Sequence, residues 1–250
     1  MEFVRSSFLK LFTTEFSSSP IAATHNASTC PQLSNDESYL INLPVTDEEI
    51  KHAVWSLKGF KSLGPDGLHA GFYQRFWLVV GRLVAEEIKN IFRDRKIPLT
   101  PNQTHIALIP KIKGLESIRS FRPISLCNMV YKVIAKIIVV RIRPLLDKLV
   151  SPFQSVFVPR RKGVDNTIVA QEIIHTISRK KGKVRYMVIK IDLEKAYDRL
   201  EWSFIREALH AANFPSDLIQ LIMSCVSSAT TSILFNGGAL EHFLPSKGIR

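Results

Sequence analysis

An α+β fold is predicted for this chain of 250 residues. Helical and strand-like patterns alternate along the sequence without a regular βαβ repeat, which favours helices and strands combined in an irregular order. With 46% hydrophobic and 22% charged residues, the composition is that of an ordinary globular protein, and the length suits one large or two small domains. We therefore expect a packed core.

The first 45 residues are predicted to be a loosely structured linker, because they contain Ser17-Ser18-Ser19-Pro20 and a Ser/Thr/Asn-rich stretch with weak periodicity. Order is predicted to begin near Val45. Thr46-Asp47-Glu48-Glu49 forms a capping box, and apolar residues follow it at helical spacing. Gly64-Pro65-Asp66-Gly67 then has the composition of a type I turn, to which we assign no direct chemical role.

The middle of the chain predicts a long helix, a strand and a second helix. The long helix contains Phe72 and has ended by Pro98, and residues 105–110 form a short strand that a proline stops and a loop follows. From residue 128 to residue 145, apolar residues recur at helical spacing. One side of this helix carries Lys132, Lys136 and Arg143. These residues fit contacts with nucleic-acid phosphates and a solvated helix face equally well.

The last third predicts a helix over residues 165–180 and then a strand over residues 184–192, which are rich in Val, Ile, Tyr and Met. Two helices follow this strand. Residues 230–235 and 240–245 are predicted to form a hairpin around Asn236-Gly237-Gly238, a strong turn signal.

The charge balance points to a polyanionic partner. The chain has 34 Lys and Arg against 22 Asp and Glu, a formal net charge of +12. Residues 1–45 carry a net charge of −2, so the basic character belongs to the predicted folded part. Nucleic acid is the leading partner and an anionic membrane the second, while a basic surface that is merely solvated is the remaining alternative.

Cysteine usage and hydropathy indicate an intracellular chain. The three cysteines, Cys30, Cys127 and Cys225, are odd in number and share no CxxC spacing, so neither a disulfide framework nor a zinc site is indicated. No segment approaches the ~20 apolar residues that span a bilayer, and Glu2 stands where a signal peptide carries basic residues. We expect no membrane partner.

Two aspartates near the end of the predicted strand 184–192 are candidate metal ligands. Asp192 closes the apolar run, and a carboxylate at a strand end suits Mg²⁺, although it also suits an Asp that merely starts a turn. Asp198-Arg199-Leu200-Glu201 has the spacing of a capping box for a helix through Trp202, and we favour this interpretation over a metal-binding role.

The spacing of Asp192 and Tyr197 resembles the first palm motif of reverse transcriptases. Further segments extend the resemblance in order: Gly64-Pro65-Asp66-Gly67, Leu108-Ile109-Pro110-Lys111, Phe121-Arg122-Pro123-Ile124-Ser125-Leu126, Gln154-Ser155-Val156-Phe157 and Asp165-Asn166. The wording is similar to LINE-type, non-LTR retrotransposon enzymes, above all those of plants, and covers residues 45–250. It implies a right-hand polymerase-like α+β fold, with fingers over residues 46–183 and a partial palm over residues 184–250.

The resemblance also implies roles for single residues. Asp192 and the Leu193 carbonyl would bind catalytic Mg²⁺, while Tyr197 would be the steric gate against a ribose 2′-hydroxyl, with core packing as the alternative. Lys111 and Arg122 would hold the triphosphate of the incoming dNTP, with Lys113 and Arg119 as competitors for the Lys111 role. Residues that would contact the template are Gln154, Phe157 and Arg161.

The same resemblance implies partners and a place of action. The partners are an RNA template, an RNA–DNA hybrid and dNTP, and integration into chromosomes implies nuclear access. The oligomeric state is not predicted.

The sequence departs from the family pattern at two places. Val156 replaces a small residue and Arg160 replaces a glycine, which supplies a backbone conformation that arginine disfavours. Where the chain reads Lys247-Gly248-Ile249-Arg250, the family continues into Gln-Gly-Asp-Pro and an Ala-Asp-Asp hairpin. We therefore expect an incomplete metal site and no primer extension by these 250 residues alone. The alternatives are a non-catalytic nucleic-acid-binding remnant and a group II intron maturase-like fragment.

Overall fold

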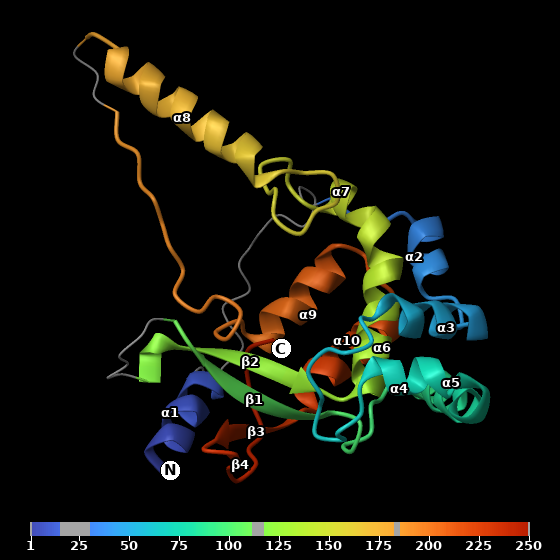
Figure 1. The fold of residues 1–250 in the computed structure, drawn as a ribbon. Coiled ribbons are helices and arrows are strands. Elements are labelled where there is room, and N and C mark those ends of the chain that lie inside the picture. The colour runs from blue at the N-terminus through green and yellow to red at the C-terminus, as the bar shows by residue number, and fades with distance from the viewer. Residues whose placement is uncertain (1, 16–30, 112–117, 183–185, 250) are drawn as a thin grey trace.

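The computed structural model describes residues 2–15, 31–111, 118–182 and 186–249, and it combines helices with a four-stranded sheet, which confirms the α+β prediction (Figure 1). The α-helices are α1 (Glu2–Phe12), α2 (Asn35–Ile41), α3 (Asp47–Ser56), α4 (Ala70–Arg75), α5 (Trp77–Asp94), α6 (Met129–Ile142), α7 (Leu146–Leu149), α8 (Gly163–Arg179), α9 (Trp202–Ala211) and α10 (Ser216–Ser227). The strands are β1 (Gln103–Pro110), β2 (Phe121–Cys127), β3 (Thr230–Phe235) and β4 (Gly238–Ala239), and the 3-10 helices are η2 (Ile118–Ser120) and η3 (Arg143–Leu145).

The sheet has the strand order β2-β1-β3-β4. β1 pairs antiparallel with β2 and parallel with β3, so it joins two parts of the chain that are far apart in sequence. β3 and β4 form a hairpin at the predicted turn, where Asn236 and Gly237 have φ values of 49° and 82°. Two successive positive φ values are typical of a type I′ turn, which matches the twist of a hairpin. The second strand is Gly238–Ala239, however, and the prediction of a strand over residues 240–245 is wrong, since only Phe243 forms an isolated bridge there, to Thr231.

β2 occupies residues that were predicted to form a loop, and that prediction is wrong. Pro123 lies in the strand and has no N–H to donate, which made the segment look unlike a strand. Among the strands that the structure describes, β2 lies at the edge and pairs with β1 alone, so its outer side needs no donor.

The main core lies between helices. Val54 of α3, Ile88 of α5, Ile134 of α6 and Leu221 of α10 are buried in one apolar cluster. The capping box at Thr46 is confirmed, since its hydroxyl accepts from the Glu49 N–H and the Glu49 carboxylate accepts from the Thr46 N–H. The predicted long helix is divided into α4 and α5.

A second cluster joins α1 to the sheet. Phe8 and Phe12 of α1 pack with Ile106 of β1, Ile233 of β3 and Phe243. Figure 1 shows α1 beside the sheet, next to β3 and β4. The linker prediction is therefore wrong for α1 and α2, whereas the serine-rich part of that region and Cys30 lie outside the described residues. α1 is stabilised because its apolar face packs against the sheet. This contact is made with residues distant in sequence, so the polar composition of residues 1–45 did not predict it.

The turn at residues 64–67 fastens the loop before α4 to the start of α6. Asn128 accepts from the Asp66 N–H and donates to the Thr100 carbonyl, while the Asp66 carboxylate accepts from the N–H of Met129. A Cβ on Gly64 would lie 2.6 Å from the Asn128 N atom. The motif therefore has a structural role, as predicted.

Residues 186–192 do not form the strand predicted over residues 184–192. Their apolar side chains are largely exposed, among them Met187 at 80%, Ile189 at 68% and Ile191 at 78%. A strand requires a neighbour that pairs with its N–H and C=O groups, and in the described ranges no strand pairs with this segment. Figure 1 shows the segment running beside no other strand, after α8, which projects from the body.

Among the described residues, no helix combines the length and the apolar character needed to cross a membrane.

Candidate nucleotide-binding cavity

The β1–β2 pair places two of the predicted phosphate-binding residues close together. Arg122 lies opposite Ile109 in the antiparallel register. Lys111 follows the last residue of β1, and its N–H donates to the Ser120 carbonyl at 2.9 Å. The ladder therefore holds the backbones of Lys111 and Arg122 near one end of the sheet.

A second wall is built from two chain segments that hydrogen-bond to each other. The Gly248 N–H donates to the Leu200 carbonyl at 2.7 Å, and the Ile249 N–H donates to the Tyr197 carbonyl at 3.0 Å. The Trp202 indole N–H donates to the Gly248 carbonyl at 2.7 Å. Gly248 has φ 84°, and a Cβ there would lie 2.7 Å from the Asp198 carbonyl oxygen, so glycine is required for this contact.

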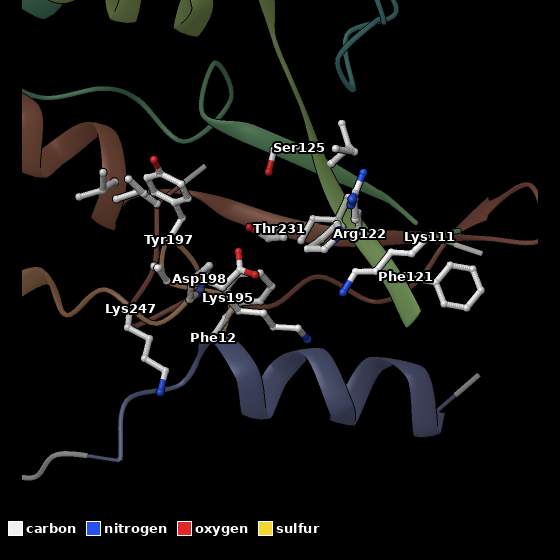
Figure 2. Close-up of a pocket in the computed structure, with 18 of the residues that line it drawn as sticks. Phe12, Lys111, Phe121, Arg122, Ser125, Lys195, Tyr197, Asp198, Thr231 and Lys247 are labelled. Atoms are coloured by element: carbon white, nitrogen blue, oxygen red, sulfur yellow. The ribbon is translucent and has the colours of Figure 1, made fainter. Parts of the chain in front are cut away.

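Between these walls lies a cavity of about 1060 Å³. Its lining includes three residues predicted to bind the nucleotide, Lys111, Arg122 and Tyr197, and one predicted to touch the template, Phe157. Figure 2 shows Tyr197 and Asp198 on one side of the view and Lys111 and Arg122 on the other.

The cavity is positively charged. Its lining contains four basic residues and one acidic residue: Lys111, Arg122, Lys195, Lys247 and Asp198. The sequence motifs indicated no nucleotide-binding role for Lys195, Asp198 or Lys247. Lys247 and Gly248 lie near Tyr197 in the fold although they are distant from it in sequence. No local sequence pattern predicts this contact.

Asp198 is not a helix cap, and that prediction is wrong. α9 begins at Trp202, after a Glu201 that makes no side-chain capping hydrogen bond. The Asp198 side chain lines the cavity instead, and partial burial raises the pKa of its carboxyl group, an effect that the nearby Lys195 opposes. The capping-box spacing misled because a turn over residues 195–199, with the Arg199 N–H donating to the Lys195 carbonyl, precedes the helix.

Tyr197 and Phe157 meet at the rim of the cavity. Their ring centroids are 6.3 Å apart at an interplanar angle of 79°, an edge-to-face arrangement. Tyr197 is 56% exposed, so the alternative role in core packing does not hold.

The loop that carries Phe157 has two non-glycine residues in left-handed conformations. Phe157 has φ 65° and Arg160 has φ 67°. The expectation that the position of Arg160 favours glycine is therefore confirmed. Asn166 steadies the loop by donating to the Phe153 carbonyl and the Ser155 hydroxyl, which links two segments of the resemblance.

The other predicted template residues are placed differently. Arg161 directs its guanidinium at its own loop, where it donates to the Asp147 carboxylate and to the Val150, Ser151 and Gln154 carbonyls. The Arg161 N–H groups are therefore engaged within the loop, whereas a contact with a template phosphate would need them as donors. The Gln154 side chain is exposed and donates to the Val156 carbonyl at 3.4 Å.

Asp192 and Leu193 lie outside the cavity lining, and both are exposed. Mg²⁺ prefers oxygen ligands, which the Asp192 carboxylate and the Leu193 carbonyl provide. In the part of the chain that the structure describes, however, no three Asp, Glu, His or Cys residues are grouped to hold a metal ion. These two residues do not form a complete magnesium site. Lys113 and the side chain of Arg119 lie outside the described residues.

Three known proteins align with most of the chain. A 149 kDa protein of transposon TX1 from Xenopus laevis is 28% identical over 88% of the chain and 17% of its own length. Pol polyproteins of R2 retrotransposable elements from Drosophila melanogaster and Popillia japonica are 22% and 26% identical over 82% and 78% of the chain. The chain spans 19% and 26% of those two relatives.

A protein-family model matches the part of the chain that forms most of the cavity. It is described as reverse transcriptase (RNA-dependent DNA polymerase) and matches residues 109–250, which include all the basic residues of the lining. Because this match covers more than half of the sequence, the chain belongs to the reverse transcriptase family.

Proposed function

We propose that the cavity binds a deoxynucleoside triphosphate, in an RNA-directed DNA polymerase domain of a LINE-type, non-LTR retrotransposon. The observation that carries the proposal is the meeting of Lys111, Arg122 and Tyr197 in one cavity, although Tyr197 is 75 residues or more from the other two in sequence. The segment Phe121-Arg122-Pro123-Ile124-Ser125-Leu126-Cys127-Asn128 favours a LINE element over a group II intron maturase.

The chemistry of the lining suits a triphosphate. The Arg122 guanidinium offers two parallel N–H donors to phosphate oxygens, and the Lys111 ammonium adds a compact charge. Lys195 and Lys247 strengthen the positive field from the opposite wall. A deoxyribose would then lie against the Tyr197 ring, which is in edge-to-face contact with Phe157, and this ring would exclude a ribose 2′-hydroxyl.

Mg²⁺ is the proposed cofactor, with Asp192 and the Leu193 carbonyl as two of its ligands. When bound, the ion supplies charge neutralisation at the transferring phosphoryl group. The proposed macromolecular partners are an RNA template and the RNA–DNA hybrid, and the proposed site of action is the nucleus.

A second candidate function is nucleic-acid binding without catalysis. The position of Asp192 favours it, since this carboxylate, the predicted catalytic residue, is exposed on a segment outside the cavity. In this case the basic surface would bind nucleic acid, and the cavity would not select nucleotides.

Nucleotide binding by variants of the chain tests the first proposal. A fluorescent dATP analogue is titrated and its affinity is measured. Arg122→Ala should weaken binding about tenfold or more, because a hydrogen bond to a charged group contributes ~1.5–3 kcal/mol. Arg206→Ala, which removes an exposed charge of the same sign on α9, is the matched control and should bind normally.

Tyr197 is tested by comparing dATP with ATP. The wild-type chain should prefer dATP, and Tyr197→Ala should remove that preference by admitting the 2′-hydroxyl. If Arg122→Ala, Lys111→Ala and Arg206→Ala all bound the analogue as the wild type does, the cavity would not be a nucleotide site. Salt-dependent RNA binding would then favour the second candidate.

A further inference from the structure

The turn that carries Tyr197 takes part of its hydrogen bonding from a distant segment. Within the turn, Lys195 has φ 51°, and its carbonyl accepts from the Arg199 N–H at 3.1 Å. The Tyr197 carbonyl accepts instead from the N–H of Ile249 at 3.0 Å. Because Tyr197 is 56% exposed, core packing does not fix its ring. The position of the ring therefore depends on how the backbone of the turn is held.

Residues 246–249, which we call the wall segment, hold this turn from the side of α1. The N–H groups of Ser246 and Lys247 donate to the Phe12 carbonyl, at the end of α1, at 2.8 and 3.2 Å. Beyond this anchor the segment lines the cavity and reaches the turn of Tyr197. Figure 2 shows Lys247 and Tyr197 on the same side of the view. The wall segment is therefore fastened to α1 at one end and to the turn at the other.

Trp202, the first residue of α9, fastens the wall segment to the helical core. Its indole N–H donates to the Gly248 carbonyl at 2.7 Å. The Trp202 side chain is partly buried and packs against the main apolar cluster, so its position is set by the core. Trp202 is not among the residues that line the cavity. It therefore acts on a bound ligand through the wall segment and not by direct contact.

The fit between Gly248 and the turn is tight enough to pass a displacement on to Tyr197. A Cβ on Gly248 would lie 2.7 Å from the Asp198 carbonyl oxygen, a distance that Cβ atoms essentially never show. The residue after Gly248 is Ile249, whose N–H holds the Tyr197 carbonyl. A shift of Gly248 away from Trp202 therefore moves the donor on which the backbone of Tyr197 depends.

We propose that Trp202 is a positioning residue for Tyr197, and that its hydrogen bond to Gly248 sets how strictly the cavity excludes a ribose 2′-hydroxyl. This inference rests on the proposed nucleotide-binding function of the cavity. Lys111 and Arg122, the proposed phosphate ligands, lie on the other side of the cavity in Figure 2. Loss of the Trp202 hydrogen bond therefore changes the selection of the sugar more than it changes the affinity for the triphosphate.

Titration of the full chain with fluorescent analogues of dATP and ATP tests the proposal. Trp202→Phe keeps an aromatic ring in the core and removes the N–H donor. The preference for dATP, measured as the ratio of the two dissociation constants, should fall about two- to tenfold, the range for one neutral hydrogen bond. The dATP affinity should stay within about twofold, because the charged contacts to phosphate are intact. Gly248→Ala disturbs the same contact from its other side and should lower the preference as well.

A second measurement needs no nucleotide. Hydrogen exchange at the Gly248 and Ile249 amides should be faster in Trp202→Phe, because the wall segment opens more readily. The matched control is Trp77→Phe, which trims another partly buried tryptophan that packs against the same cluster. Trp77 lies on α5 and does not line the cavity. This control should leave both the preference for dATP and the exchange of the two amides unchanged.

Failure of this inference is distinguishable from failure of the proposed function. An unchanged preference for dATP in Trp202→Phe would overturn the inference alone, whether or not amide exchange became faster. An equal loss of affinity for dATP and ATP, or the same changes in Trp77→Phe, would reduce Trp202 to a role in stability. A wild-type chain that binds neither analogue would remove the proposed function, and the inference with it.

Discussion

Arg160 shows how a single residue can be strained by its backbone. Its φ of 67° costs a non-glycine residue roughly 1–2 kcal/mol. Glycine removes that strain but gives the unfolded chain more freedom, which offsets about 0.4–1 kcal/mol. Arg160→Gly should therefore raise the free energy of unfolding by about 0.5–1 kcal/mol, measured by urea denaturation.

Lys162→Gly is the control for this prediction. Lys162 has φ −116°, an ordinary value for any residue, so glycine there relieves no strain. The substitution should lower the free energy of unfolding by about 0.5–1 kcal/mol, because glycine only adds freedom to the unfolded state. Equal effects of both substitutions would contradict the interpretation of the Arg160 backbone.

Residue-level prediction succeeded where a side chain's chemistry was tied to its position in a motif. Lys111, Arg122 and Tyr197 were chosen from separate motifs, and the fold brings them to one cavity. It failed for Asp198, because a capping-box spacing states which hydrogen bonds are possible and not which ones form. The Asp198 side chain is partly buried, and its backbone lies against Gly248, which is distant in sequence.

At the scale of elements, Arg141 joins α6 to α3 and to the chain that leads into it. Its guanidinium donates to both oxygens of Glu49 and to the carbonyls of Ile41, Leu43 and Pro44. The Arg141 side chain is only 10% exposed. Arg141→Ala should lower the free energy of unfolding by about 2–4 kcal/mol, because it leaves several polar groups without their partner.

The pH dependence of this pair has a defined sign. The Arg141 hydrogen bond is the main cause that lowers the pKa of Glu49 below 4.5, against the opposing effect of burial. The pair's contribution is present above pH 4.5 and is lost as the pH falls through the lowered pKa of the folded state. In Arg141→Ala, the free energy of unfolding should therefore fall less steeply as the pH is lowered below 4.5.

The exposed pair of Lys89 and Asp47 is the control for Arg141. Its ammonium and carboxylate are 2.6 Å apart, but the two side chains are 41% and 63% exposed. Lys89→Ala should change the free energy of unfolding by no more than about 1 kcal/mol. A comparable loss in Lys89→Ala and Arg141→Ala would show that burial does not distinguish the two pairs.

Elements were predictable from sequence where local signals decide them. The α3 capping box and the β3–β4 turn depend on a few adjacent residues, and both are confirmed. β2 and residues 186–192 were predicted incorrectly for one shared reason. A strand depends on its neighbour, so β2 forms beside β1 in spite of Pro123, while the apolar segment 186–192 pairs with no described strand.

At the scale of the whole molecule, some apolar side chains lie in buried clusters and others, including those of residues 186–192, are exposed. Ile233 of β3 is fully buried in the cluster that joins α1 to the sheet, whereas Ile189 and Ile191 are 68% and 78% exposed. Isoleucine side chains at these positions should therefore contribute unequally to the free energy of unfolding. Exposed apolar stretches also promote association between molecules.

The double variant Ile189→Thr/Ile191→Thr tests this division. It should change the free energy of unfolding by no more than about 0.5 kcal/mol, because neither side chain is buried. It should also lower the binding of a hydrophobic dye and self-association in sedimentation. Ile233→Ala, in contrast, should cost about 2–5 kcal/mol through the cavity that it leaves. If the double variant were as destabilised as Ile233→Ala, residues 186–192 would have to be packed against another part of the chain.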